Sequence, residues 1–380
     1  AKKFQVCPFE LCLDVATWVD DIICDYNYVF DPNVYLKRFF QEGIRGDYIF
    51  LVDEAHNLVE RSREMYSAQI YKEDFLAIKK IMKRYHAKFE RLFQKCNQIL
   101  LDYKRECEKY VCYDNIGNFI FAAMNLASEL DEFLQKTVEF PERKEVTEFY
   151  LNLRNFIRIY ELVDEHYMIY SEHEEDGRFK LKLYCVDPSE NIQHCIDKGN
   201  ATIFFSATFL PIQYYKSLLS TKKDNYAVYA ETTFTPDQRL LLFGTDVSSK
   251  YTRRNEAEYK KIASYIKKTV LAQKGNYIVF FPSYKMMEEV QEVFLWEMGD
   301  KADCIMQQSG MKEEEREEFL AEFTKEREKS FVAFCVMGGI FGEGIDLRQE
   351  QLIGAMIVGT GLPQICNERE VIREYFDRQQ

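Results

Sequence analysis

The pattern of apolar and polar positions divides the 380-residue chain into three parts. Residues 1–64, and again those from 178 onward, alternate short apolar runs with polar turns, which is typical of α/β structure. Residues 65–177 carry apolar side chains at helical spacing and contain one Pro and two Gly. One such stripe runs from Ile78 to Tyr103 and a second from Val146 to Val163. The pattern predicts an all-helical insertion in one α/β domain, with a second α/β domain behind it.

The change in pattern sets the expected domain boundaries. The first domain comprises residues 1–64 and 178–212, the insertion residues 65–177, and the second domain residues 213–380. Apolar runs separated by helical segments indicate parallel sheets in both domains. Ala201–Phe205 is expected to be a buried strand of the first domain.

Composition and charge narrow the class of protein. Hydrophobic residues make up 47% of the chain and charged residues 30%, which excludes a disordered chain, a collagen and a small disulfide scaffold. The net charge of −13 argues against coating nucleic acid non-specifically, although a local basic channel would suffice to bind phosphates. No apolar run approaches the roughly 20 residues needed to span a bilayer.

The cysteines and the first residues bear on location. Ala1–Glu10 lacks the apolar core of a signal peptide, so we expect a cytoplasmic protein with reduced thiols. Cys7, Cys12 and Cys24 lie close together in the sequence. The ordinary expectation for such cysteines is that they are buried as small apolar residues.

The strongest candidate for chemistry is Asp53-Glu54-Ala55-His56, which directly follows the apolar run Tyr48–Val52. Ligands bind at the carboxyl ends of strands in an open parallel sheet. Asp53 could hold a Mg²⁺ that carries nucleotide phosphates, and Glu54 could orient or deprotonate the attacking water. His56 would lie where it can sense the γ-phosphate. The alternative is an ordinary strand end with solvated acids, but the full string favours the functional interpretation.

Two pairs of hydroxyl residues lie at other expected strand ends. Ser206 and Thr208 follow the strand at 201–205 and could bond to the acids of a neighbouring strand, or simply cap a helix. Ser283 and Tyr284 follow a second apolar run. They could contact a nucleic-acid backbone or stack on a base, with a capped helix start as the alternative.

A glycine-rich stretch, Gly338–Asp346, has four Gly in its first seven residues. Such a stretch lets the backbone approach a ligand closely, and a flexible loop is the alternative. The residues expected to face a nucleotide or a cleft are Gly342, Glu343, Gly344 and Asp346.

In this order, the strings resemble the motifs of superfamily 2 DNA helicases of the XPD/DinG type. The matches are Asp53–His56 with motif II, Ser206–Thr208 with motif III, Phe281–Ser283 with motif IV and Gly338–Asp346 with motif V. The stretch Asp21–Tyr28 is similar to the family's segment before motif II. The resemblance implies two RecA-like domains, the first incomplete, with an arch-type insertion.

The family's function follows by the same resemblance. It implies a helicase that couples Mg-ATP hydrolysis to translocation on single-stranded DNA, in repair or replication. The implied nucleic-acid contacts are Tyr26, Asn27, Ser283 and Tyr284. A non-catalytic module that binds nucleic acid or protein is the alternative.

Departures from the family pattern qualify these expectations. The 380 residues contain no G-x-x-x-x-G-K-[ST] and no arginine-bearing motif VI. The resemblance therefore implies the middle of a longer helicase, inactive by itself, whose first domain exposes an edge or an apolar face. Cys7-Pro8 resembles the last ligand position of the [4Fe–4S] cluster found in some members. No Cys precedes it here, so a cluster is conceivable only in the longer protein.

Overall fold

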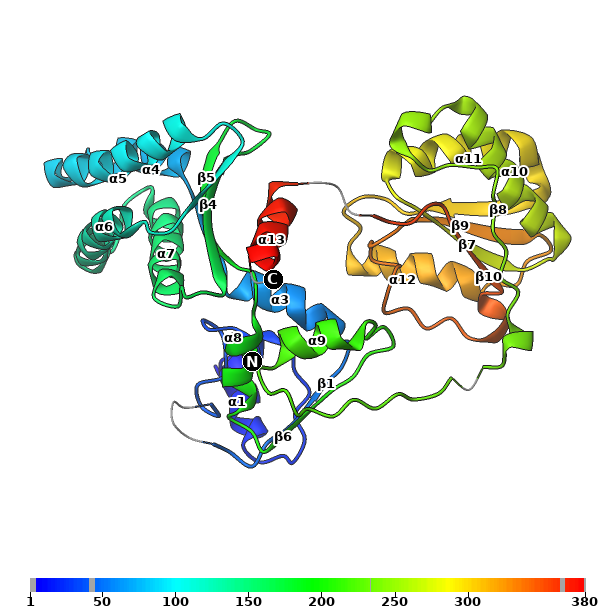
Figure 1. Cartoon of the computed structure of the whole chain (residues 1–380), viewed down its shortest axis with the longest axis horizontal. Coiled ribbons are helices and arrows are strands. Elements are labelled where there is room, and N and C mark those ends of the chain that lie inside the picture. The colour runs from blue at the N-terminus through cyan, green and yellow to red at the C-terminus, as the bar shows by residue number, and fades with distance from the viewer. Residues whose placement is uncertain (1–4, 41–44, 233, 363–365, 379–380) are drawn as a thin grey trace. The chain divides into compact units, whose positions relative to one another are not determined.

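The computed structural model describes residues 5–40, 45–232, 234–362 and 366–378 (Figure 1). The chain forms two compact units, the first comprising Ala1–Tyr229 with Ile365–Gln380 and the second Ala230–Gln364. The end of the chain thus returns to the first unit. Within the part of the chain that the structure describes, no helix is long and apolar enough to cross a membrane.

A pair of parallel strands forms the centre of the first unit. β1 (Ile49–Val52) lies beside β6 (Ala201–Phe204), with Ile49 opposite Ala201 and Val52 opposite Phe204. The helices that share its core are α2 (Asn27–Phe30), α3 (His56–Met65), α8 (Ser189–Ile196) and α9 (Ile212–Leu219). α1 (Pro8–Ala16) precedes them and buries no residue.

The prediction that Ala201–Phe205 is a buried strand is wrong. Ile49, Leu51 and Ile203 are each more than half exposed. Val52 on the opposite face is buried. A pair of strands alternates its side chains between two faces, and the described helices cover one of them. The expectation of an exposed apolar face on the first domain is thereby confirmed.

The insertion between β1 and β6 is not all-helical, contrary to the prediction. It contains the antiparallel sheet β2-β5-β4-β3, formed by Ala68–Tyr71, Phe179–Cys185, Tyr167–His173 and Tyr110–Tyr113. β4 and β5 form a hairpin whose turn contains Gly177, with a positive φ of 85°. The predicted domain boundary at Gly177 is wrong, because Gly177 is a turn residue and the insertion continues to Cys185. The alternation of polar and apolar residues in Phe179–Cys185 has the period of a strand.

The helices of the insertion follow the predicted stripes with one interruption. They are α4 (Lys72–Met82), α5 (Ala87–Glu106), α6 (Gly117–Lys136) and α7 (Arg143–Tyr160). The stripe from Ile78 to Tyr103 is split, because α4 ends at Met82 and the His86 side chain caps α5 by accepting from the Lys88 amide at 3.1 Å. The phenylalanine rings of the four helices share one core, with Phe75 and Phe149 centroids 5.0 Å apart.

The second unit contains the predicted parallel sheet. Its strand order is β10-β7-β9-β8, formed by Gly354–Ile357, Asn276–Phe281, Ser330–Val336 and Ala302–Met306. α10 (Glu256–Ala272) and α11 (Tyr284–Met298) cover one face. α12 (Glu313–Ala321) packs on the other (Figure 1). This is the layered arrangement expected of a RecA-like domain.

The last helix, α13 (Asn367–Arg378), lies elsewhere than predicted. The sequence placed it in the second domain, but it packs on β4 and β5 of the insertion. Val371 and Tyr375 form a stripe four residues apart, which Met168 and Tyr170 of β4 cover. Lys182 of β5 also forms an ion pair with Glu368.

The second unit also begins later than residue 213. Leu218 and Leu219 of α9 are buried in the core of the first unit, so that unit extends to Tyr229.

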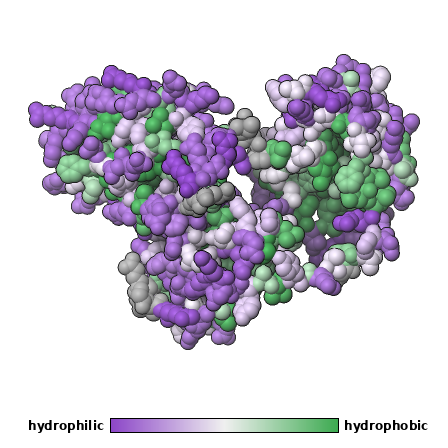
Figure 2. All heavy atoms as spheres, in the orientation of Figure 1, coloured by the Kyte–Doolittle hydropathy of each residue, from purple (hydrophilic) through white to green (hydrophobic). Residues whose placement is uncertain are grey.

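On the face shown in Figure 2, the helices of the insertion present mostly hydrophilic side chains to solvent.

Candidate active site

The Asp53-Glu54 turn adjoins the end of β6, as the sequence predicted. The Ala55 amide donates to the Phe205 carbonyl at 3.1 Å, and the Phe205 amide donates to the Val52 carbonyl at 3.0 Å. These bonds extend the strand pairing beyond β1 and β6, so the side chains that follow both strands emerge together. Glu54 has a φ of +45°, which is uncommon for a residue other than glycine.

His56, Ser206 and Glu54 form a hydrogen-bonded cluster. His56 Nδ1 lies 2.8 Å from Ser206 Oγ and 3.3 Å from Glu54 Oε2, and Ser206 Oγ lies 3.3 Å from the same carboxylate oxygen. The Thr208 amide donates to Ser206 Oγ at 3.2 Å. Because a hydroxyl carries one hydrogen, Ser206 can donate to Glu54 while its oxygen accepts from Thr208 and from a protonated His56 Nδ1.

The exposure of these groups suits a site for a substrate. The His56 side chain is 14% exposed, whereas that of Glu54 is 52% exposed. The imidazole is therefore held by the protein and the carboxylate is open to a bound molecule. A half-buried base oriented by two partners and facing solvent has the geometry of a group that positions water.

The carboxylates fit a magnesium ion. Asp53 and Glu54 are both exposed, and one oxygen of Asp53 accepts the Glu54 amide at 2.8 Å. Mg²⁺ binds proteins through one or two carboxylates and retains water and phosphate oxygens as its other ligands. The donor set of this turn matches that preference.

The cysteines do not fit an iron–sulfur cluster. The structure describes all eleven Cys residues, and none forms a disulfide. Cys7, Cys12 and Cys24 are exposed, in contrast to the expected burial, because α1 and the segment after it pack little. Among the described residues, the one group of three or more His, Cys, Asp or Glu within ligating distance is Asp164-Glu165-His166. Among the described residues, the cysteines do not come within ligating distance of one another in a group that could hold a cluster.

Tyr26 and Asn27 lie beside the turn. The Tyr26 hydroxyl donates to the backbone carbonyls of Asp53 and Glu54, the latter at 3.1 Å. Asn27 Oδ1 accepts from Arg61 at 3.4 Å. Both residues were predicted to contact nucleic acid, and that role stays a prediction; the structure gives each of them a partner within the protein.

The glycine-rich stretch of the second unit is an anchored loop. Gly338 and Gly344 have positive φ values of 71° and 67°. Phe341 is buried, and its ring stacks on Phe319 at 4.1 Å. Arg316 donates to the Gly344 carbonyl at 2.9 Å. Phe341 therefore anchors the start of the exposed part of the loop, and Arg316 anchors its middle.

The exposed part of this loop holds the predicted contact residues. Gly342, Glu343, Gly344 and Asp346 are all accessible to solvent. Asp346 pairs with Arg348 at 2.7 Å, and the hydrogen bond and charge of Arg348 lower the pKa of the Asp346 carboxyl. Their contact with a nucleotide stays a prediction.

Ser283 and Tyr284 start α11, and Gln307, which the sequence analysis missed, links Tyr284 to the end of β9 just before the glycine loop. Ser283 caps the helix by accepting from the Met286 amide at 3.4 Å. Gln307, 2% exposed at the end of β8, donates to the Tyr284 hydroxyl at 3.1 Å and accepts from the Val336 amide at 3.0 Å. A Cβ on Gly339 would lie 2.8 Å from the Gln307 amide nitrogen, so a side chain there would displace the Gln307 amide. The sequence feature that could have identified Gln307 is its position as a polar residue directly after an apolar strand.

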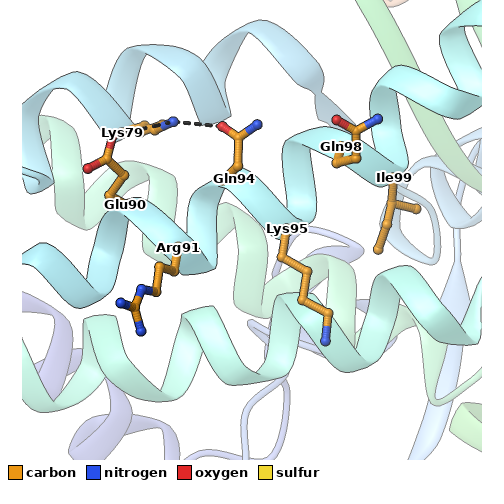
Figure 3. Close-up of a pocket in the computed structure, with 7 residues that line it drawn as sticks. All are labelled: Lys79, Glu90, Arg91, Gln94, Lys95, Gln98 and Ile99. Atoms are coloured by element: carbon orange, nitrogen blue, oxygen red, sulfur yellow. Dashed lines mark hydrogen bonds and ion pairs between the residues drawn. The ribbon is translucent and has the colours of Figure 1, made fainter.

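A separate cavity of about 630 Å³ lies on the insertion (Figure 3). Its lining residues are Lys79, Glu90, Arg91, Gln94, Lys95, Gln98 and Ile99. Lys79 donates to Gln94 at 2.7 Å, while Arg91 and Lys95 extend from the other side of α5 (Figure 3). None of these residues belongs to the Glu54 cluster, and the lining offers no nucleophile–base pair. We therefore assign the site by the strand-end cluster and not by cavity volume.

Comparisons with known proteins bear on the family of the chain. A family model described as DEAD_2 matches residues 1–75, and a Helicase C-terminal domain model matches residues 266–380. ATP-dependent DNA helicase CHL1 of Scheffersomyces stipitis is 22% identical over 374 residues, covering 83% of this chain and 44% of that protein. ATP-dependent DNA helicase XPD of Sulfolobus acidocaldarius is 22% identical over 292 residues, covering 75% and 50%. The chain spans about half the length of these curated relatives.

Solved structures share the fold. A structure titled as an XPD helicase aligns with a TM-score of 0.54 at 18% identity, covering 99% of this chain and 65% of that chain. The structure of S. tokodaii Xpd4 aligns with a TM-score of 0.56 at 14% identity, covering 93% and 68%. The two family models and the named relatives together identify a protein of helicase superfamily 2. Within that superfamily, the chain belongs to the XPD/DinG type.

Proposed function

We propose that this chain serves in an ATP-dependent DNA helicase, in which the turn after β1 acts on Mg-ATP. The observation that carries the proposal is the cluster in which Ser206, at the end of β6, lies within 3.3 Å of both Glu54 and His56. Two carboxylates at a strand end, one of them tied to a hydroxyl at the end of the adjacent strand, can respond to a phosphate and transmit that response.

Each residue of the cluster has a proposed role. Asp53 would hold Mg²⁺, which would neutralise charge on the phosphates. Glu54 would orient the attacking water and accept its proton. His56 and Ser206 would hold the Glu54 carboxylate, and Ser206 with Thr208 would pass changes at the turn to the end of β6.

The nucleic-acid partner is the less direct part of the proposal. We propose single-stranded DNA as the track, with Ser283, Tyr284, Tyr26 and Asn27 as contacts and with Gly342–Asp346 facing the nucleotide. The named relatives are DNA helicases, which supports DNA as the nucleic acid; the pathway, repair or replication, rests on the family resemblance alone. The expectations that the protein is cytoplasmic and that this chain alone is inactive stay predictions.

Glu54→Gln tests the proposal in the natural protein that carries these residues. The substitution preserves size and removes the base, so the ATP turnover number should fall by about 10²-fold or more. Binding of a fluorescent ATP analogue should persist. Glu64→Gln, on the exposed side of α3, is the matched control and should leave turnover unchanged. A Glu54→Gln protein that hydrolyses ATP at the wild-type rate would contradict the assignment.

A further inference from the structure

Tyr26 lies beneath the Asp53-Glu54 turn and bonds to its backbone. It precedes Asp53 by 27 residues in sequence, yet its one hydroxyl hydrogen is shared between the carbonyl oxygens of Asp53 and Glu54. The contact therefore joins the residue that precedes α2 to the turn after β1.

The turn needs such a contact because of its backbone conformation. The φ of +45° at Glu54 lies in the left-handed region, which an L-residue with a Cβ occupies only when its surroundings impose it. The amide of Glu54 is bonded to the Asp53 carboxylate, and the amide of Ala55 to Phe205. The Tyr26 hydroxyl supplies the complementary restraint on the two carbonyls. Rotation of either peptide would break that bond.

Tyr26 is itself held firmly. Its ring packs on the core that contains Val52 and Leu58, so the same core supports β1, α3 and the phenol. A phenolic hydroxyl is neutral and carries its hydrogen under ordinary conditions, so it is available as a donor to the turn.

From this geometry we infer that Tyr26 is a positioning residue for the proposed hydrolytic turn. Its hydroxyl fixes the peptides of Asp53 and Glu54, and thereby the direction in which their carboxylates leave the end of β1. Tyr26 does not touch the reacting atoms. The inference rests on the proposed function of Glu54, and it assigns the hydroxyl to the protein, where the sequence had predicted a nucleic-acid contact.

Tyr26→Phe isolates this hydroxyl in the natural protein. The ring and its packing remain, and only the two bonds to the carbonyls are lost. A displaced carboxylate impairs the chemical step more than it impairs nucleotide binding, so kcat for ATP should fall about 10-fold while KM changes less than about twofold. Tyr113→Phe is the matched control, because it removes a hydroxyl that bonds Ser171 Oγ at 2.8 Å within the insertion. It should leave both constants unchanged.

Two further measurements make the outcome decisive. Replacing Tyr26 by 4-aminophenylalanine restores a donor at the same position and should bring kcat to within about threefold of wild type. This variant also decides the matter if Tyr26→Phe fails to fold: a folded aminophenylalanine protein with a tenfold loss would overturn the inference. In the 380-residue chain, the imidazole NMR signals of His56 should shift in Tyr26→Phe and not in Tyr113→Phe, because His56 bonds the repositioned Glu54.

Failure of the inference and failure of the proposed function give different results. If Glu54→Gln is inactive but Tyr26→Phe keeps wild-type kcat, the positioning role is wrong and the proposed function stands. If Tyr26→Phe raises KM and leaves kcat unchanged, the hydroxyl serves binding, and the inference is again overturned. If Glu54→Gln retains wild-type turnover, the proposed function itself has failed.

Discussion

The docking of α13 on the insertion can be weakened at one buried residue, Val371. This side chain is fully buried on the β4–β5 sheet. Val371→Ala removes two methyl groups and leaves the polar contacts of the helix, including the pair between Glu368 and Lys182, in place. The substitution therefore tests the apolar part of the contact alone.

The expected loss follows from the groups removed. Each buried methyl contributes about 0.8 kcal/mol by transfer, and the cavity left behind adds to that, for a total of about 2 kcal/mol. α13 has 12 residues, and an isolated helix of that length is marginal in water. Undocking should therefore unfold α13 locally while the remainder of the first unit stays folded. A change of about 2 kcal/mol corresponds to a roughly 30-fold larger open population.

Hydrogen–deuterium exchange followed by mass spectrometry measures that population directly. Amides of residues 367–378 should exchange roughly 30-fold faster in Val371→Ala, with β7 and β9 unchanged. Arg369→Ala alters an exposed position of the same helix and should have no such effect. If α13 keeps its wild-type protection in folded Val371→Ala, the helix does not depend on this contact, and its placement in the first unit is wrong.

Three further substitutions test other parts of the structure. Ser206→Ala removes the hydroxyl at the centre of the half-exposed cluster and should cost about 1 kcal/mol in the free energy of unfolding. In the natural protein the same substitution should lower the rate of DNA unwinding more than the rate of ATP turnover. Equal losses of the two rates would argue against a coupling role for Ser206. Phe75→Ala should destabilise the insertion by about 3–5 kcal/mol in urea unfolding, whereas exposed Phe121→Ala should change stability little. Burial alone would raise the pKa of Glu73, but the Phe179 amide at 2.9 Å and Lys104 lower it overall. The stabilisation is therefore present above the unfolded pKa of about 4.3 and lost as pH falls through the folded value. Glu73→Gln should accordingly flatten the acid side of the melting-temperature profile, and an unchanged profile would contradict this.

The local sequence was sufficient for the strand-end motifs. Asp53 and Ser206 each follow an apolar run, and parallel strands bring their carboxyl ends to one edge of a sheet. The parallel sheet of the second unit and the stripes of α5 and α7 were likewise predicted correctly. In each case the information lies within about 20 residues of chain, because helical and strand periodicities are local properties.

The tertiary structure decided what depends on distant partners. β2 and β3 are four-residue strands that exist because β5 and β4 pair with them, so their own sequence carries little signal. The apolar stripe of α13 shows that the helix must be covered, but not that β4 covers it.

The hydrogen bonds that support the site residues also depend on partners that are distant in the sequence. Tyr26 reaches the Asp53-Glu54 turn, and Gln307 joins Tyr284 to the end of β9, in each case across 23 or more residues of sequence. Hydrogen bonds of this kind depend on where two separate segments meet in space. The type of a residue shows whether its side chain can donate or accept a hydrogen bond. Only the packing of the whole unit determines the partner of that bond.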